Sequence, residues 1–315
     1  MSSITRSILA VGLSLLSLGA SAADKTQLSL MLDWFVNPNH GPIVIAKEKG
    51  YFDEANLDVD IQEPADPSVP AKMVAAGKSD LAVTYQPSLT IDVAAGLPLV
   101  RTGTLISTPL NVMLTLKSSG IDSVEKLKGK TIGISVGGNE EGTVGNMLES
   151  AGLTFDDIKI VNVGWALSSS LASGKVDAVW GAMRNFESNQ LELEGQPVNE
   201  FFPEEHGVPT YDELVFVANS KTYDKTVISA FNHAIERATL YIVNHPDKAW
   251  KEFVQYSPDT LDTKLNQMAW EDTLTRFALR PQAADANAYQ NFANFMYDTG
   301  LIKNKVTGEQ ILADF

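Results

Sequence analysis

Short apolar runs alternate with amphipathic stretches along most of this chain. Strand-like segments, in which apolar residues are continuous or alternate with polar ones, occur at residues 28–32, 57–62, 81–84, 99–106, 112–116, 130–136, 158–163, 178–180 and 214–218. Helical patterns lie between them at residues 43–49, 70–76, 88–95, 144–151 and 166–172, with a short helical turn at 124–127 and a helical region from Thr226 onward. Strands that alternate with helices are typical of an α/β fold with a mainly parallel sheet.

The length of the chain and its lack of linkers predict two closely joined lobes. At 315 residues, 44% of them hydrophobic, the chain can form two modest cores, yet no flexible or low-complexity joint separates two halves. We therefore expect strands that cross between the lobes near residues 107–113 and 214–219. Lobe one then comprises residues 23–108 plus 216–315, lobe two comprises 109–215, and the C-terminal helices pack back on lobe one.

The N-terminal residues have the pattern of a secretory signal peptide. Arg6 precedes an apolar run, Ile8 to Leu18, and Ala20-Ser21-Ala22 is a small-residue cleavage site. We expect residues 1–22 to be removed by cleavage near Ala22; the alternative is a short buried helix. The chain contains no Cys, so neither a lipid anchor after the cleavage site nor a disulfide framework is expected. These features predict a soluble protein of a Gram-negative periplasm.

Charge and motif content argue against several classes of function. The formal net charge is −15 and no basic cluster occurs, which disfavours nucleic acid or an anionic membrane surface as a partner. The histidines, at positions 40, 206, 233 and 245, have no metal-ligand spacing, and no HExxH, GxSxG or CxxC motif is present. We therefore expect no catalytic residues, no metal and no cofactor.

The segment from Leu30 to Phe52 is the first candidate for a binding site. A predicted strand leads into a polar turn that carries Asp33, Trp34, Asn37, Asn39 and His40, and a helix follows. In open α/β sheets, ligands bind outside the carboxyl ends of the strands, where this turn would lie. The alternative is that Trp34 belongs to the core and the asparagines only form the turn.

A glycine-rich loop between a strand and a helix is the second candidate. Gly137, Gly138 and Asn139 would let the backbone approach a ligand, but Glu140 and Glu141 follow them and would repel an anion. This loop therefore predicts a neutral or weakly basic ligand. Alternatively, the two glutamates point into water at a helix N-terminus, where the macrodipole favours them.

The third candidate is the end of the strand at 178–180, which we expect Gly181 to break. Arg184, Asn185 and Glu187 follow. A carboxylate at this place can accept two N–H bonds from a flat heteroaromatic ring such as an aminopyrimidine. The alternative is a surface ion pair between Arg184 and Glu187, which would contribute little.

These stretches together resemble a known family. The segments are DWFVNPNHGPIVIAKEKGYF, EPADPS, GKSDLAVTYQPSL, KLKGKTIGISVGG and GAMRNFESNQLELEG. They are similar to the pyrimidine-precursor-binding proteins of thiamine uptake, the substrate-binding components of ATP-binding-cassette (ABC) importers, in the same order over nearly the whole mature chain. The resemblance implies a type II periplasmic-binding-protein fold, in which two α/β lobes joined by crossing hinge strands close on a ligand. It also implies a permease and an ATPase as partners, and a monomer is the default for this fold.

The resemblance further implies the ligand and its contacts. The expected ligand is hydroxymethylpyrimidine or formylaminopyrimidine, and the implied contacts are Trp34, Asn37, His40, Tyr85, Gln86, Gly138, Asn139, Glu187 and Tyr211. Trp34 and Tyr85 would stack on the ring, and Glu187 would pair with its amino edge. Asn37 and His40 would hold the exocyclic substituent, while the loop at Gly138 closes from the other lobe.

The same superfamily contains an enzyme, the fungal pyrimidine phosphate synthase, which looks similar in three of these segments. Thr84 stands where that enzyme has its cofactor-binding Lys, and Ser88 stands where it has its reactive His. Its run of cysteines falls near residues 212–216, and this chain has no Cys. We therefore expect a binding protein rather than an enzyme. Flavin precursors and alkanesulfonates, which relatives bind, remain alternative ligands, although the glutamates of the glycine loop weigh against sulfonates.

Overall fold

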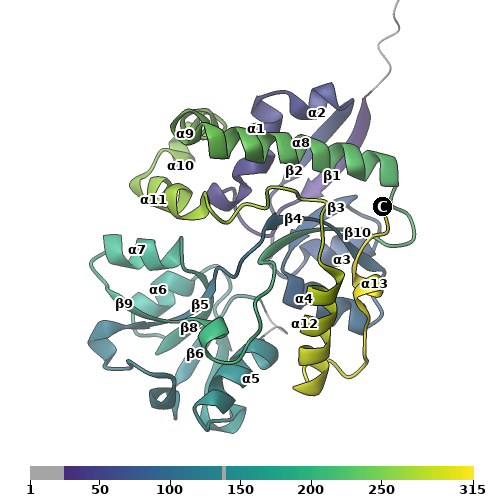
Figure 1. Cartoon of the computed structure of the whole chain (residues 1–315). Coiled ribbons are helices and arrows are strands. Elements are labelled where there is room, and N and C mark those ends of the chain that lie inside the picture. Colours follow the sequence, from purple (N-terminus) through teal and green to yellow (C-terminus); the bar gives the residue numbers. More distant parts are fainter. Residues whose placement is uncertain (1–24, 137–139) are drawn as a thin grey trace, which may run out of the picture.

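Two five-stranded sheets organise the molecule, shown as a computed structural model in Figure 1, which describes residues 25–136 and 140–315. The first sheet has the order β2 (Leu57–Gln62), β1 (Thr26–Met31), β3 (Leu81–Thr84), β10 (Leu214–Asn219) and β4 (Leu99–Ile106). The second has the order β7 (Lys159–Asn162), β6 (Thr131–Ile134), β8 (Ala178–Met183), β5 (Asn111–Leu116) and β9 (Val198–Phe201). The expected α/β architecture with two lobes is present.

Each sheet contains one strand that runs against the others. In the first sheet β10 pairs antiparallel with both β3 and β4, and in the second β5 pairs antiparallel with β8 and β9. The remaining pairs, β1 with β2 and β3 and β6 with β7 and β8, are parallel. Both sheets are therefore mixed: in each, four strands share one direction, as the prediction requires, and the fifth is reversed. The reversed strands, β5 and β10, are the ones that the chain forms directly after it changes lobe.

The chain crosses between the sheets twice. The outbound crossing joins the end of β4 at Ile106 to the start of β5 at Asn111, within the predicted segment. The return crossing, residues 202–213, joins β9 to β10. The prediction that residues 214–219 form this crossing is wrong, because β10 lies wholly in the first sheet; the predicted lobe boundary at 216 falls inside it.

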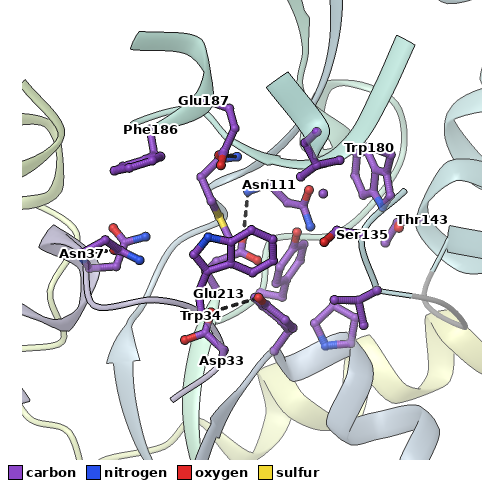
Figure 2. Close-up of a pocket in the computed structure, with 18 residues that line it drawn as sticks. Asp33, Trp34, Asn37, Asn111, Ser135, Thr143, Trp180, Phe186, Glu187 and Glu213 are labelled. Carbon is purple, nitrogen blue, oxygen red and sulfur yellow. Dashed lines mark hydrogen bonds between the residues drawn. The ribbon is translucent and has the colours of Figure 1, made fainter. Parts of the chain in front are cut away.

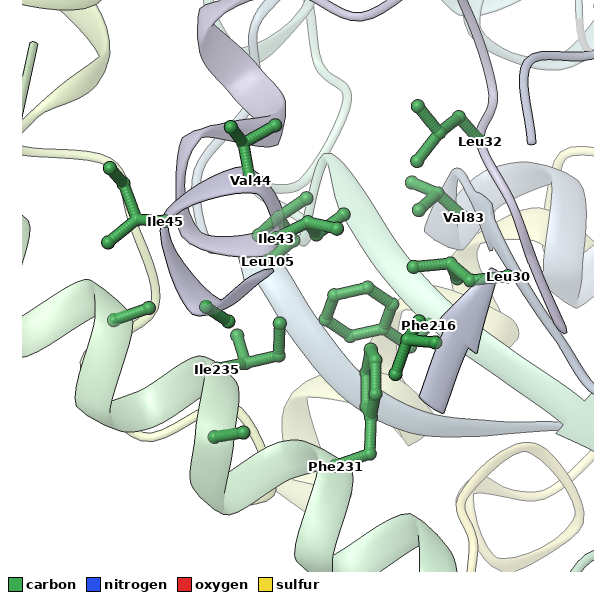
Figure 3. Packing of buried hydrophobic residues seen from close by; sticks show 14 of the residues in the cluster. Leu30, Leu32, Ile43, Val44, Ile45, Val83, Leu105, Phe216, Phe231 and Ile235 are labelled. Atoms are coloured by element: carbon green, nitrogen blue, oxygen red, sulfur yellow. The ribbon is translucent and has the colours of Figure 1, made fainter. Parts of the chain in front are cut away.

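Burial of both sheet faces explains the uninterrupted apolar sequence of β10. Phe216 faces one core, where its ring packs edge-on against Phe231 at a centroid distance of 5.0 Å, whereas Val215 and Val217 face the other. Alternate residues of a strand point to opposite faces, so a strand covered on both sides needs apolar residues throughout. Figure 3 shows Ile43 and Ile235 packing into the first of these cores, beside Leu30 and Phe216.

The helices of the first lobe come from both ends of the chain. The N-terminal ones are α1 (Gly41–Glu48), α2 (Tyr51–Glu54), α3 (Pro70–Ala75) and α4 (Gln86–Ala94). The C-terminal ones are α8 (Lys225–Asn244), α9 (Pro246–Gln255), α10 (Pro258–Leu261), α11 (Lys264–Thr273), α12 (Ala286–Asp298) and α13 (Gly308–Ile311). Helices α8 and α9 pack on α1, and α13 packs on α4, so the expected return of the C-terminal helices to lobe one is confirmed.

The second lobe carries α5 (Glu140–Ser150), α6 (Leu167–Ala172) and α7 (Glu187–Leu193). The chain also forms short 3-10 helices: η1 (Pro38–His40), η2 (Lys117–Ser119), η3 (Val124–Leu127), η4 (Phe155–Asp157) and η5 (Pro203–Glu205). The prediction that Gly181 breaks its strand is wrong, because β8 continues to Met183 through Gly181 at φ +94°, beside an irregularity in its pairing with β5. Within the described ranges, no helix has the length and apolarity needed to cross a membrane.

Candidate ligand-binding site

A cavity lies where the two lobes face each other. Asp33 and Trp34 reach it from the end of β1, Tyr85 from the end of β3, and Ser135 from the end of β6. Figure 2 shows Asp33, Trp34 and Ser135 together with Phe186 and Glu187, which follow β8. Side chains that follow parallel strands meet at one edge of each sheet, so the strand-end rule accounts for most of this site.

The turn after β1 is held by its own side chains. The Asn37 side-chain oxygen accepts a hydrogen bond from the Asn39 amide at 2.9 Å and caps η1, while Asn37 Nδ2 donates to the Phe35 carbonyl at 2.9 Å. The Val36 amide donates to Glu63 Oε1 at 2.7 Å. These bonds fix the backbone that directly follows Trp34, so its indole is presented to the cavity by an ordered turn; Asn37 lines the cavity as well.

Asp33 is fixed by two neighbours that sequence reasoning had assigned to the ligand. His40 Nε2 lies 2.9 Å from Asp33 Oδ1, and the Tyr85 hydroxyl donates to Asp33 Oδ2 at 2.9 Å. The Asn37 amide donates to His40 Nδ1 at 3.2 Å, so Nε2 carries the proton and donates to the carboxylate. His40 is fully buried and is not among the residues that line the cavity, and its role is to hold Asp33 from behind.

Gln86 and Tyr211 differ in where they face. The Gln86 side chain is buried and accepts a hydrogen bond at Oε1 from the Asp212 amide at 2.8 Å, so it fastens the return crossing and does not line this cavity. Tyr211, the residue before Asp212, lines the ligand cavity. Gly138 and Asn139 fall outside the described residues.

Glu187 is the first residue of α7 and is 8% exposed. Its Oε2 accepts a hydrogen bond from the Met183 amide at 2.7 Å, but burial outweighs this bond and raises the pKa of Glu187 to about 7. The alternative pair with Arg184 is not formed, because that guanidinium makes a bidentate ion pair with Glu204 at 2.7 and 3.0 Å. Glu187 therefore faces the cavity with no cationic partner in the described residues.

Glu213, in the return crossing, is a second buried acid that the sequence interpretation missed. It is completely buried, and its Oε2 accepts hydrogen bonds from the amides of Leu110 at 2.5 Å and Asn111 at 2.8 Å. Burial raises the pKa of Glu213 to about 7 against the effect of these amides. The only sequence signal for it was an acidic residue directly before the apolar run of β10, and nothing in that pattern says which lobe it faces.

The chemistry of the lining is acidic and aromatic. Asp33, Glu187 and Glu213 contribute carboxylates, and no Lys, Arg or His is among the described residues that line the cavity. Five aromatic side chains complete the wall: Trp34, Tyr85, Trp180, Phe186 and Tyr211. Such a site suits a flat ring with N–H donors and repels anions. The described residues contain no cluster of three or more His, Cys, Asp or Glu side chains that could hold a metal ion.

Two contacts join the lobes beside the cavity. Trp165 of the second lobe packs against Trp34 and Phe35 of the first, with ring centroids 4.2 and 4.4 Å apart. Asn185 Nδ2, also from the second lobe, donates to Asn39 Oδ1 and Thr273 Oγ1, both at 2.6 Å. The cavity is therefore flanked by an aromatic and a polar contact between the lobes.

The relatives of this chain include proteins named as binding proteins and proteins named as enzymes. A provisionally named thiamine biosynthesis protein of Haemophilus influenzae is 54% identical over 278 residues, 88% of each chain. The formylaminopyrimidine-binding protein of Halalkalibacterium halodurans is 35% identical over 70% of this chain and 68% of its own. The 4-amino-5-hydroxymethyl-2-methylpyrimidine phosphate synthase of Candida albicans is 30% identical over 80% of this chain and 77% of its own.

Solved structures share the fold at low sequence identity. The alkanesulfonate-binding protein SsuA of Xanthomonas axonopodis pv. citri, bound to MOPS, superposes with a TM-score of 0.71 at 19% identity, over 91% of this chain and 97% of that one. This likeness confirms the expected type II periplasmic-binding-protein fold. The model of the family described as NMT1/THI5 like matches residues 37–249, so this chain is a member of the NMT1/THI5-like family.

Proposed function

We propose that this protein binds a pyrimidine precursor of thiamine, hydroxymethylpyrimidine or formylaminopyrimidine, and delivers it to an ABC importer. One observation carries the proposal: three carboxylates and no cationic side chain are found among the described residues that line the cavity. A ligand there has to supply hydrogen-bond donors, which an aminopyrimidine does through its amino group and, when protonated, a ring nitrogen. The name of the Halalkalibacterium relative supports the same class of ligand.

In the proposed complex the ring lies against Trp34 and Tyr85, while Glu187 accepts the N–H groups of the amino edge. Asn37 holds the exocyclic substituent, and Asp33, fixed by His40 and Tyr85, bounds the cavity on the side of the first lobe. Gly138 and Asn139 keep their proposed role of closing from the second lobe. No group in this arrangement has to react.

Delivery would work by closure of the hinge. Ligand contacts from both lobes favour the closed state, which presents a surface to a membrane permease driven by an ATPase. The protein would act as a monomer in the periplasm, after removal of residues 1–22. The signal-like N-terminal sequence and the shared fold support this placement.

Two alternatives remain to be tested. A synthase like that of Candida albicans would need a cofactor-binding Lys, and by the family resemblance Thr84 occupies that position, at the end of β3. A purified synthase with bound pyridoxal phosphate would be yellow, and we expect this protein to be colourless. Alkanesulfonates, the ligands of SsuA by its name, carry a negative charge that the carboxylates of the cavity disfavour.

Calorimetric titration of the mature protein, refolded to remove carried-over ligand, tests the proposal. Hydroxymethylpyrimidine, formylaminopyrimidine, thiamine, riboflavin and an alkanesulfonate would be titrated in turn. We expect binding of a pyrimidine with a Kd of about 1 μM or tighter, equivalent to about −8 kcal/mol, and no binding of the sulfonate. Binding of the sulfonate or of riboflavin alone would overturn the proposed ligand and leave the fold assignment intact.

A further inference from the structure

The two hinge crossings are fastened to each other by charged side chains. Arg184 donates through Nη2 to the Asn111 carbonyl at 3.1 Å and pairs with Glu204 of the return crossing. Glu213, at the end of the return crossing, accepts hydrogen bonds at Oε2 from the backbone amides of Leu110 and Asn111. Figure 2 shows the bond between Asn111 and Glu213 at the wall of the cavity. Glu213 therefore belongs to the hinge and to the cavity at once.

Two acceptor atoms at this place have no donor. Glu213 Oε1 and Asn111 Oδ1 are both buried, and neither accepts a hydrogen bond from the described residues. The Tyr211 side chain interacts with the Glu213 carboxyl through a weak side-chain hydrogen bond that lowers the pKa of Glu213, but the geometry of this contact does not satisfy Oε1. An unsatisfied buried acceptor is costly, and a carboxylate oxygen more so than an amide oxygen. Both residues line the cavity, so a bound ligand can supply the missing donors.

The residue next to Glu213 shows what a purely structural carboxylate looks like in the same segment. Asp212 Oδ2 accepts hydrogen bonds from the hydroxyls of Thr104 and Tyr289, both at 2.7 Å. Asp212 does not line the ligand cavity. The two adjacent acids of the return crossing therefore differ in their hydrogen bonding. Asp212 accepts hydrogen bonds from donors within the first lobe, whereas Oε1 of Glu213 has no donor among the described residues.

We propose that Glu213 Oε1 and Asn111 Oδ1 form a second recognition point of the cavity, at the hinge, for a primary amino group of the ligand. This inference rests on the proposed binding of an aminopyrimidine and deepens it. A primary amino group carries two N–H bonds, of which Glu187 accepts the one beside the ring nitrogen and the hinge pair accepts the other. The amino group then contacts the two segments that join the lobes, so its binding stabilises the closed arrangement directly.

Calorimetric titration of the full mature chain with 4-amino-5-hydroxymethyl-2-methylpyrimidine and with its analogue lacking the amino group tests this. In Glu213→Gln the amide oxygen can still accept both hinge amides, so the fold is retained, but the amide NH₂ then faces the ligand's amino group. We expect the variant to bind the amino ligand at least about tenfold more weakly and the deamino analogue within about twofold of wild type. Asp212→Asn, the matched control, should leave the ratio of the two affinities unchanged.

Each other outcome is decisive. If Glu213→Gln weakens both ligands by the same factor, or neither, the recognition point at the hinge is disproved while the proposed function stands. If the wild type binds neither pyrimidine, the proposed function fails, and this inference fails with it. Should Glu213→Gln not fold, Asn111→Ser provides the test. This substitution replaces the side-chain amide, Oδ1 included, with a shorter hydroxyl and keeps the backbone amide that donates to Glu213. A loss of about threefold or more, confined to the amino ligand, is expected.

Discussion

At the scale of single residues, the site is distinguished by buried carboxylates that have no cationic partner among the described residues. Glu187 and Glu213 are both buried, both have one oxygen bonded to backbone amides, and both have a pKa raised to about 7. Such carboxylates are destabilising in the empty cavity and become favourable when a donor-bearing ligand arrives. Asp33 differs, because His40 and Tyr85 already bond both of its oxygens.

Replacement of Glu187 by Gln should weaken binding of an aminopyrimidine. The variant loses the charge that strengthens the pairing with the amino edge, and we expect a loss of about 1.5 to 3 kcal/mol in binding free energy. Calorimetry of the variant beside wild type measures it. Glu192→Gln, an exposed substitution on the same helix, is the control and should bind like wild type. Unchanged affinity in Glu187→Gln would remove this residue from the ligand site.

The two raised pKa values predict opposite effects of pH on the empty and the bound protein. Both glutamates have an ordinary pKa of 4.5 and a folded pKa of about 7, so folding favours their protonated forms. Their contribution to the stability of the empty protein is full below about pH 4.5 and is lost as the pH rises through about 7. Urea unfolding of the empty protein should therefore show a falling midpoint over this window, beyond the trend from other groups.

Affinity should change in the other direction, because N–H donors favour the charged carboxylates. We expect ligand binding to release protons below about pH 7 and the affinity to rise as the pH approaches 8. Calorimetry in buffers of different ionisation enthalpy counts the protons. Glu187→Gln should release fewer protons than wild type. Equal proton release by both proteins would show that Glu187 does not titrate with binding.

At the scale of elements, β8 carries the site because its backbone departs from a regular strand. Gly181 lines the cavity at φ +94°, a conformation that residues with a Cβ rarely adopt, and the pairing with β5 is irregular beside it. The strand resumes to Met183, whose amide then reaches Glu187. The same glycine that suggested a strand end in the sequence is a kink within a continuous strand.

Gly181→Ala should therefore destabilise the protein through the backbone and not through a clash. A Cβ at this position would meet Ser135 Cβ at 4.0 Å, which is ordinary contact, whereas the backbone conformation would cost about 1 to 3 kcal/mol. Urea denaturation of the empty protein measures this loss. A variant as stable as wild type would contradict the strained conformation assigned to residue 181.

At the scale of the whole molecule, the two lobes touch outside the hinge at both edges of the cavity. The Trp165 contact rests on a loop fixed within its own lobe, since Ser135 Oγ donates to the Gly164 carbonyl at 2.8 Å. The contact of Asn185 with Asn39 and Thr273 includes the last residue of α11, and α11 packs on α7, its neighbour in Figure 1. Both contacts must be broken before the lobes can separate at these edges.

Trp165→Ala should speed release of the ligand. The ring pairs of Trp165 with Trp34 and Phe35 contribute about 0.5 to 1.5 kcal/mol each beyond the area they bury, and the loss should fall mainly on the dissociation rate. Stopped-flow displacement of bound ligand measures that rate. Leu193→Ala, which truncates an exposed apolar side chain on the same lobe, should dissociate like wild type. An unchanged rate in Trp165→Ala would mean that this contact does not restrain opening.

The sequence by itself determined the alternation of strands and helices and several element boundaries. Residues 57–62 and 99–106 form strands with the predicted limits. In β2 buried apolar residues alternate with exposed polar ones, as the two-residue period of a strand with one solvent-facing side requires, whereas β4 is buried along its whole length. The local sequence also predicted that Trp34, Asn37 and Glu187 follow the ends of strands, and all three line the cavity. These features depend on neighbours along the chain, which a pattern can reveal.

Only the tertiary structure decided which side chains face the ligand and which support them. His40 and Gln86 lie in the right segments, but contacts with Asp33 and with the Asp212 amide turn them to supporting roles. Glu213 joins the site because the return crossing brings residue 213 against residues 110 and 111, about a hundred positions away along the chain. The distinction between Asp212 and Glu213 has the same cause, since the environment of each acid is set by packing between distant segments and leaves no mark in the local pattern.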